Sequence, residues 1–207
     1  MLPFSSFLPT TTGEACLAMD ERLKARETSA QTISTVFGYV SPWVHNIHNS
    51  LKPTLYGHQI GMETGEVEMA MHCLVIHDMG VFLTASRSLD TLVKGMETNV
   101  HRMREFKQEM FAHFNVLCWQ TALNLNGQSA DPLIMTGKAM NQDEMINLAL
   151  EKKSVVMEAM MYSFRMLLAY LFGDLANAAM YAEKSKDFGK SRPYASVGMS
   201  NFKNCSS

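Results

Sequence analysis

The chain has 207 residues, and its 18 lysines and arginines nearly balance 20 aspartates and glutamates, for a formal net charge of -2 at pH 7. This balance gives no electrostatic reason to bind nucleic acid or an anionic membrane, since both attract strongly basic surfaces. Hydrophobic residues make up 47% of the chain and charged residues 18%, which is typical of a folded protein rather than a disordered one. The length is sufficient for a core that needs neither disulfides nor a structural metal.

The cysteines and the start of the chain favour a cytoplasmic protein. Residues 1–13 lack the basic region of a secretory signal peptide, are interrupted by Pro3 and Pro9, and are predicted to be disordered. Two stretches without Asp, Glu, Lys or Arg, 28–51 and 110–130, carry polar residues throughout and do not fit a membrane span. The cysteines show neither a zinc pattern nor a disulfide framework, which favours a reducing compartment; they are Cys16, Cys73, Cys118 and Cys205.

Long helices are expected because residues 54–131 and 133–192 contain no proline. Segment 32–40 is rich in β-branched and aromatic residues that would also suit a strand, but no second strand is available to pair with it. A helical domain over 14–190 is predicted, with an irregular loop at about 127–141 joining two helical units and an irregular tail at 191–207. The helices are predicted at 14–26, 28–39, 46–63, 66–82, 86–103, 105–125, 142–152, 154–171 and 174–187.

A local pattern occurs twice, at Gly65 and at Gly173. Each glycine precedes an acidic residue that opens a helix, and each is followed five positions later by an alanine, Ala70 or Ala178, small enough for close helix packing. The glycines are 108 positions apart (173 − 65 = 108), or three times 36, which is near the roughly 34-residue period of tetratricopeptide units. An ordinary helical hairpin turn occurring twice explains the pattern equally well. The sequence therefore predicts an all-α fold of antiparallel helical hairpins stacked as a tetratricopeptide-like array.

No catalytic, cofactor-binding or metal site is predicted. The closest histidine pairs have the wrong spacing for a helical zinc site. Fragments that resemble kinase or phosphate-loop motifs lack the remaining motifs of those enzymes. The pairs are His45 with His48, His72 with His77, and His58 with Glu63, and the fragments are residues 101–103, 187–189 and 189–191.

Methionine is unusually frequent, with 18 residues. The helical spacing of several methionines fits core positions between packed helices, and an adaptable surface for several partners is the alternative. Trp43 and Trp119 are predicted to be packing anchors rather than ligand platforms. The methionines in question are Met69, Met71, Met157, Met160, Met161 and Met166.

Six segments resemble a helical region of very large multidomain signalling proteins. In that family a protein-kinase-like domain often precedes an AAA-type ATPase, which is followed by tetratricopeptide-like helices and then a sensor, histidine kinase or nucleotide cyclase module. The resemblance covers roughly residues 15–190 and includes none of the family's catalytic motifs. It implies a helical connector or interaction segment that is a short separate chain, a fragment of a longer product or a gene remnant. The segments are 41–43, 51–53, 61–71, 119–125, 136–140 and 168–174.

Two hypotheses of function follow. The first is a non-catalytic scaffold or connector, without a cofactor, that binds a protein partner or flanking signalling domains. The second is an enzyme or small-ligand binder with a cavity lined by His72, His77 or His113, and convergence of these histidines on one polar pocket would favour it. Self-association is also expected, because an array without polar terminal units exposes an apolar face, here Leu175, Ala178, Ala179, Tyr181 and Ala182.

Overall fold

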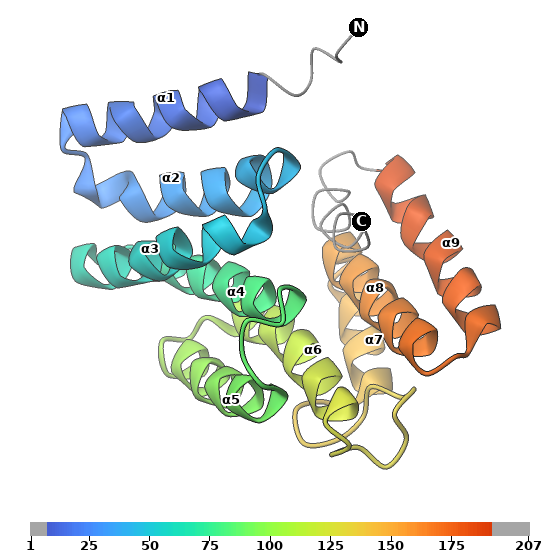
Figure 1. Ribbon diagram of the computed structural model, residues 1–207. Coiled ribbons are helices and arrows are strands. Elements are labelled where there is room, and N and C mark those ends of the chain that lie inside the picture. Colours follow the sequence, from blue (N-terminus) through green and yellow to red (C-terminus); the bar gives the residue numbers. More distant parts are fainter. Residues whose placement is uncertain (1–7, 192–207) are drawn as a thin grey trace, which may run out of the picture. The chain divides into compact units, whose positions relative to one another are not determined.

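The computed structural model describes residues 8–191, and the regular secondary structure of this part of the chain is all helix, without a strand (Figure 1). The predicted all-α class is therefore confirmed. The α-helices are α1 (Leu8–Leu23), α2 (Ser29–Thr35), α3 (Leu51–Thr64), α4 (Val67–Leu83), α5 (Leu89–Glu105), α6 (Glu109–Leu125), α7 (Gln142–Glu151), α8 (Val155–Leu171) and α9 (Leu175–Ser191).

Short helical turns join the first helices. Between α1 and α2 lies a 3-10 turn, η1 (Arg26–Thr28), and α2 continues into a π-helical turn, η2 (Val36–Val40). The β-branched segment 32–40 is therefore helical, as predicted, although its π-helical turn was not foreseen. Two more 3-10 turns, η3 (Ser41–Trp43) and η4 (Ile47–Ser50), lead into α3.

The largest boundary difference is at the start of the chain. Helix α1 begins at Leu8 rather than at residue 14, so residues 8–13, predicted to be disordered, are helical. Residues 1–7 of the predicted disordered segment lie outside the described residues. The predicted C-terminal tail does too, except for Ser191, which ends α9.

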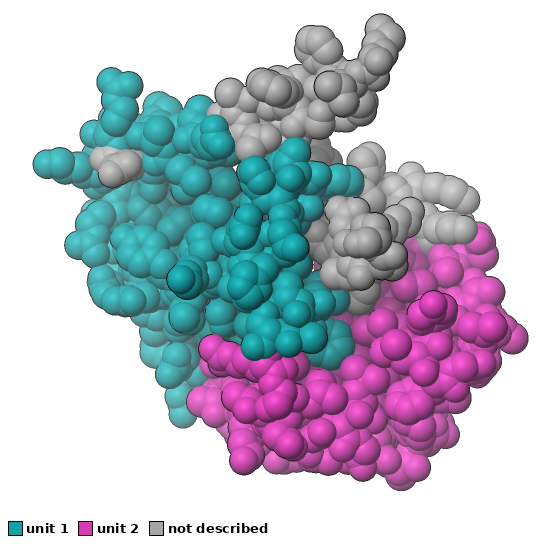
Figure 2. All heavy atoms as spheres, in the orientation of Figure 1, with its two compact units in different colours: residues 1–86, 102–111 teal, residues 87–101, 112–207 magenta. Residues whose placement is uncertain are grey.

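The helices form two compact units (Figure 2). Unit 1 comprises residues 1–86 and 102–111, and unit 2 comprises residues 87–101 and 112–207. In unit 1, α2, α3 and α4 pack on one another and α1 packs on α2, whereas in unit 2 α8 packs on both α7 and α9. The prediction that the loop at about 127–141 joins two units is wrong, because α6 from residue 112 onward, the loop and α7 all belong to unit 2.

Most helices end in the same turn, in which one residue is left-handed. Gly65 has φ = 86° and Gly173 has φ = 83°, as their predicted role in ending helices requires. The turns after α4, α5 and α7 use Ala85, Lys107 and Lys153 instead, with φ between 47° and 57°. A non-glycine residue in this conformation costs about 1–2 kcal/mol. Glycine spacing therefore reveals only part of the pattern.

The same hydrogen bonds close five of these turns. The N–H of the left-handed residue donates to the carbonyl three positions back, and the next N–H donates to the carbonyl five positions back, as in Ala85 to Phe82 (3.2 Å) and Ser86 to Val81 (3.2 Å). These bonds satisfy carbonyls that the end of a helix leaves without an intrahelical donor. The left-handed residues concerned are Ala85, Lys107, Gly127, Lys153 and Gly173.

The 108-position interval does not contain three equal repeats. Five helices, α4 to α8, lie between Gly65 and Gly173, whereas three two-helix units would require six. The two glycines occupy similar local turns, between α3 and α4 and between α8 and α9, but not equivalent positions in a strict two-helix repeat.

Small residues allow α2, α3 and α4 to approach closely in unit 1. A Cβ placed on Gly61 would lie 2.9 Å from the Cβ atoms of both Ala30 and Ala70, which is closer than side-chain carbons ordinarily pack. Ala30 and Ala70 are both completely buried. In unit 2, Ala178 of α9 is also buried. Both alanines singled out in the sequence therefore lie at packed positions.

The two tryptophans differ in their surroundings. Trp119 is buried in unit 2, as predicted for a packing anchor. Trp43 lies in η3 and is 49% exposed, so its prediction as a packing anchor is wrong: the 3-10 turn buries its neighbours Ser41 and Pro42 instead. Met71, Met157 and Met161 are buried core residues, whereas Met69, Met160 and Met166 are half-buried.

Candidate functional site

An open groove of about 480 Å³ lies in unit 1, where residues of α3 meet the last turn of α5. Four of its lining residues come from α3 and form two pairs, each with residues four positions apart, which are neighbours on the surface of a helix. Arg102 and Phe106 come from the end of α5 and the turn that follows it. The α3 residues are His58, Gln59, Met62 and Glu63.

His58 links α3, α4 and α5 within this unit. Its side chain is 7% exposed, its Nδ1 lies 3.1 Å from the carbonyl oxygen of Ala70, and its Nε2 lies 3.3 Å from Nη1 of Arg102. A guanidinium group only donates hydrogen bonds, so Nε2 accepts one from Arg102 and Nδ1–H donates to Ala70. This pair of bonds requires the neutral form of the imidazole.

The two charged groups of the groove differ in how they are paired. Glu63 is neutralised, because its Oε2 lies 3.0 Å from Nη2 of Arg26 in η1 and its Oε1 accepts a bond of 2.9 Å from Gln59. Arg102 donates to neutral His58, and neither of the ion pairs among the described residues includes it. The groove therefore carries a positive charge that no carboxylate of the described chain offsets.

The environment of His58 favours its neutral form. Burial lowers the pKa of its imidazole below the ordinary 6.5, the hydrogen bond to the Ala70 carbonyl opposes this shift, and electrostatic interactions with Arg102 and His77 lower the pKa further. A proton on Nε2 would also remove the acceptor that holds Arg102 and would place two cations side by side. We therefore expect acid to disrupt the arrangement of the groove.

Acidification from pH 7 to pH 5 is expected to destabilise unit 1 through His58. Its pKa is lower in the folded protein than in the unfolded chain, so the unfolded chain binds more protons in the interval below about 6.5. The unfolding free energy consequently falls as the pH falls from about 6.5 toward the folded-state pKa. Nuclear magnetic resonance titration of the imidazole should give a pKa below 6.5, and urea unfolding at several pH values should show a weaker pH dependence in His58→Gln. A pKa of His58 at or above 6.5 would contradict this account.

The histidines of the second hypothesis do not line this groove. In unit 1, the ring of His72 stacks on Phe111 with centroids 5.3 Å apart, and its Nε2 lies 2.8 Å from the Tyr39 hydroxyl. Nδ1 of His77 lies 2.9 Å from the Leu51 carbonyl oxygen. His113 is a half-buried residue of α6 in unit 2. Each of the first two histidines is therefore satisfied in a separate place, and the histidine that does line the groove is His58.

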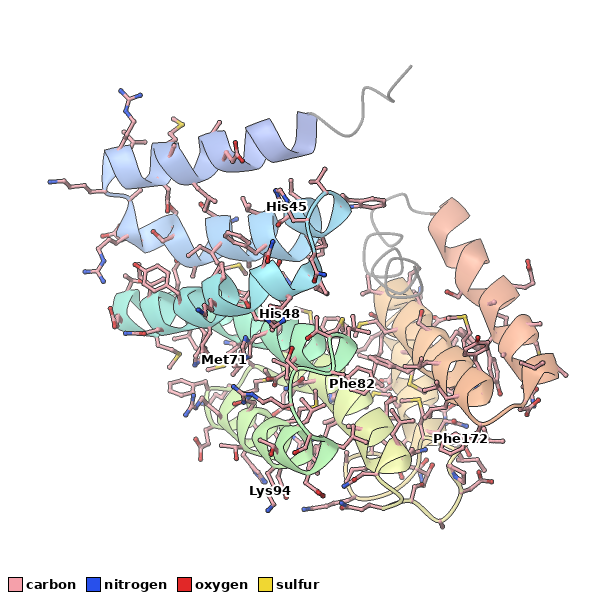
Figure 3. The ribbon with its side chains drawn as sticks, viewed as in Figure 1. His45, His48, Met71, Phe82, Lys94 and Phe172 are labelled. Atoms are coloured by element: carbon pink, nitrogen blue, oxygen red, sulfur yellow. The ribbon has the colours of Figure 1, made fainter. Side chains whose placement is uncertain are left out.

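The other motifs examined in the sequence lie apart from any catalytic arrangement. His45 and His48 are exposed on the segment between α2 and α3 (Figure 3). Residues 101–103 belong to α5, and residues 187–191 belong to α9 rather than to loops of the kind that kinase and phosphate-binding motifs form. Among the described residues, no three side chains of His, Cys, Asp or Glu come together as a metal site would require.

The sequence pointed to only part of this site. The sequence offers His58 and Glu63 as a possible metal pair, and both residues line the groove. In the sequence, Arg102 stands out only as part of the kinase-like fragment 101–103. Its pairing with His58 joins positions 44 residues apart, and the pairing of Arg26 with Glu63 joins positions 37 residues apart, so no local pattern in the sequence reports these contacts.

The fold and the site define an all-α protein with an electropositive surface groove. None of the helices in the described residues has the combined length and apolar character needed to cross a bilayer. Comparison with known protein families, curated proteins and solved structures finds no match for this chain.

Proposed function

We propose that this chain is a non-catalytic helical scaffold or connector that binds a protein partner, and that the partner places an acidic side chain in the groove beside Arg102. The observation that carries the proposal is the pairing of the groove: Glu63 is neutralised by Arg26, while Arg102 meets only a neutral imidazole. A carboxylate entering the groove would form the charge-assisted, two-pronged bond for which a guanidinium group is suited.

The other walls of the groove suit a protein segment. Met62 is half-buried and Phe106 is 42% exposed, so both offer apolar surface beside the arginine. Methionine adapts to irregular surfaces, and aromatic and arginine side chains are enriched at the centres of protein interfaces. The lining residues include no serine, threonine, cysteine, tyrosine or lysine, the usual nucleophiles apart from carboxylate and histidine. These features favour binding over covalent chemistry.

The resemblance to the helical region of large signalling proteins extends this proposal. It supports a tetratricopeptide-like connector in the cytoplasm that relays conformation between, or docks onto, flanking signalling domains. The turns shared by successive helices are compatible with such stacked hairpins, although the interval between Gly65 and Gly173 does not follow a fixed period.

A small carboxylate ligand is the second candidate, and the size of the groove favours it. A volume of about 480 Å³ falls within the range of small-molecule sites, and one histidine, His58, lines the groove, although the three histidines named for this hypothesis do not. In this case Arg102 would bind the carboxylate of a free molecule rather than that of a side chain.

The proposal predicts that a capped peptide with one glutamate between two leucines binds the intact protein through Arg102. We expect shifts of the backbone amide resonances of residues 58–63 that saturate with peptide. Arg102→Gln should weaken binding about tenfold or more, which corresponds to about 1.4 kcal/mol. The matched control is Arg104→Gln, which changes an exposed arginine of α5 that does not line the groove.

Two results would contradict the proposal, and a third would favour the second candidate. Equal binding of the glutamate peptide and its glutamine counterpart, or equal binding by the Arg102 variant, would exclude the groove as an acidic-segment site. Acetate that produces the same Arg102-dependent shifts at the same concentration would instead favour the small-ligand candidate.

A further inference from the structure

Helices α8 and α9 of unit 2 bring two cations and two tyrosines together, far from the lining residues of the groove in sequence. The guanidinium carbon of Arg165 lies 4.3 Å from the ring centroid of Tyr181 and 6.0 Å from that of Tyr162. The ammonium nitrogen of Lys184 lies 5.1 Å from the centroid of the same Tyr162 ring, and the two tyrosine rings are 6.2 Å apart. We call these four residues the α8–α9 cluster.

Helical spacing builds this cluster from two adjacent helices. Tyr162 and Arg165 are three positions apart on α8, and Tyr181 and Lys184 are three positions apart on α9, so each pair lies on one helix face. The extensive packing of α8 against α9 brings the two faces together (Figure 1). Phe172, at the turn that connects these helices, is labelled in Figure 3.

The groups at this cluster are hydrogen-bond donors. Nη2 of Arg165 donates to the hydroxyl oxygen of Tyr181 over 2.6 Å, so the phenolic hydrogen is left to donate elsewhere. Nε of Arg165 is buried and has no hydrogen-bond partner. Neither ion pair among the described residues includes Arg165 or Lys184. The cluster therefore has two positive charges and several donors, with no carboxylate paired to either cation.

We propose that the α8–α9 cluster binds the dianion of phosphate or of a phosphate monoester. A monoester carries about -1.5 to -2 charges at pH 7 and three strong acceptor oxygens, which matches two cations and a hydroxyl donor better than a single carboxylate does. The N–H groups of Arg165 that do not bond Tyr181 would donate directional bonds to phosphate oxygens, and the lysine adds a mobile point charge. The tyrosine rings hold the guanidinium group through cation–π contacts and limit its access to water.

This site is separate from the groove of the proposed function. Its four residues belong to unit 2, whereas all the lining residues of the groove belong to unit 1. A phosphate site here would give the protein a second binding site. Its ligand would be either free phosphate or a phosphorylated side chain of a partner. Binding at the groove and binding at the α8–α9 cluster can be tested independently.

The experiment titrates the full chain with inorganic phosphate and, separately, with O-phosphoserine at constant ionic strength. Saturable shifts of the Arg165 Nε resonance and of α8 and α9 amides are expected with both probes if the site recognises the phosphate group itself. Tighter binding of phosphoserine would identify a modified side chain as the natural source, and equal or tighter binding of inorganic phosphate would identify the free anion.

The variants separate binding from folding. Arg165→Gln is expected to weaken phosphate binding at least tenfold and Lys184→Gln several-fold, while Lys152→Gln, an exposed lysine of the same unit, should leave it unchanged. Lys184 is exposed, so its substitution keeps the proposal testable even if Arg165→Gln unfolds α8 and α9. Shifts that do not saturate, or that are identical in the Lys184 and Lys152 variants, would overturn the proposal.

Discussion

Ala70→Leu is expected to lower the unfolding free energy by about 3 kcal/mol, at the upper end of the usual range for overpacked cores. Ala70 is completely buried, and the Cβ position of Gly61 is already 2.9 Å from its Cβ atom. Three additional carbon atoms at this position must push α4 away from α3 or from Ala30 of α2. For a chain of this length, each kcal/mol lowers the midpoint of thermal unfolding by about 2–4 °C.

The α8–α9 hairpin offers matched controls for this substitution. Ala178→Leu changes an alanine that is 7% exposed, so we expect a smaller loss, and Ala179→Leu changes an exposed alanine next to it, so we expect almost none. Urea and thermal unfolding followed by circular dichroism would rank the three variants. An Ala70→Leu protein as stable as the Ala179→Leu protein would show that the close approach of α2, α3 and α4 is described incorrectly.

The second large effect is expected from Asn124→Ala, which removes the main attachment of the loop between α6 and α7. The amide nitrogen of Asn124 donates to the carbonyls of Pro132 (3.1 Å) and Ile134 (2.8 Å), and its oxygen accepts from Gln120 (2.8 Å). Gln120 in turn accepts from the backbone N–H of Ala139 over 3.0 Å. Truncation leaves several of these groups unpaired, and each buried unpaired group costs about 1–3 kcal/mol. We expect a total loss of about 3 kcal/mol.

A neighbouring asparagine provides the control. Asn126 donates a hydrogen bond of 2.9 Å to Asp90 at an exposed site, so Asn126→Ala should cost less than about 1 kcal/mol. Urea unfolding would give the two free energies, and hydrogen exchange of the Ala139 amide would show whether the loop opens. Equal losses in the two variants, or unchanged exchange at Ala139 in Asn124→Ala, would mean that the buried amides do not hold the loop.

The helices could be predicted from the sequence because their signals are local. Proline-free stretches and apolar residues at helical spacing depend on residues a few positions apart, and they placed α3 to α8 within a few residues of their observed ends. The ordered loop could not be predicted in the same way. Its glycines and proline indicate only that residues 127–141 are irregular. The order of the loop depends on hydrogen bonds from Gln120 and Asn124, which appear in the sequence as ordinary polar positions of a helix.

Only the part of the candidate site that lies on one helix, α3, could be predicted from the sequence. The spacing of His58 and Glu63 drew attention to α3, but the charge of the groove depends on Arg26 and Arg102. The turns show the same limitation. Ala85, Lys107 and Lys153 take a left-handed conformation that their intrinsic preferences oppose, so the sequence indicates only the turns that use glycine.

The interleaved order of the two units makes neither of them an uninterrupted stretch of the gene. The chain leaves unit 1 after Ser86, returns at Arg102, and leaves again after Phe111. Recombination or truncation at one point can therefore neither transfer nor delete one unit without also removing part of the other. A chain that stops at Ser86 would keep His58 and Glu63 on α3 and would lose Arg102 and Phe106. A gene segment that carries the complete groove must therefore also carry residues 87–101 of unit 2. These residues connect the α3 side of the groove to Arg102 and Phe106.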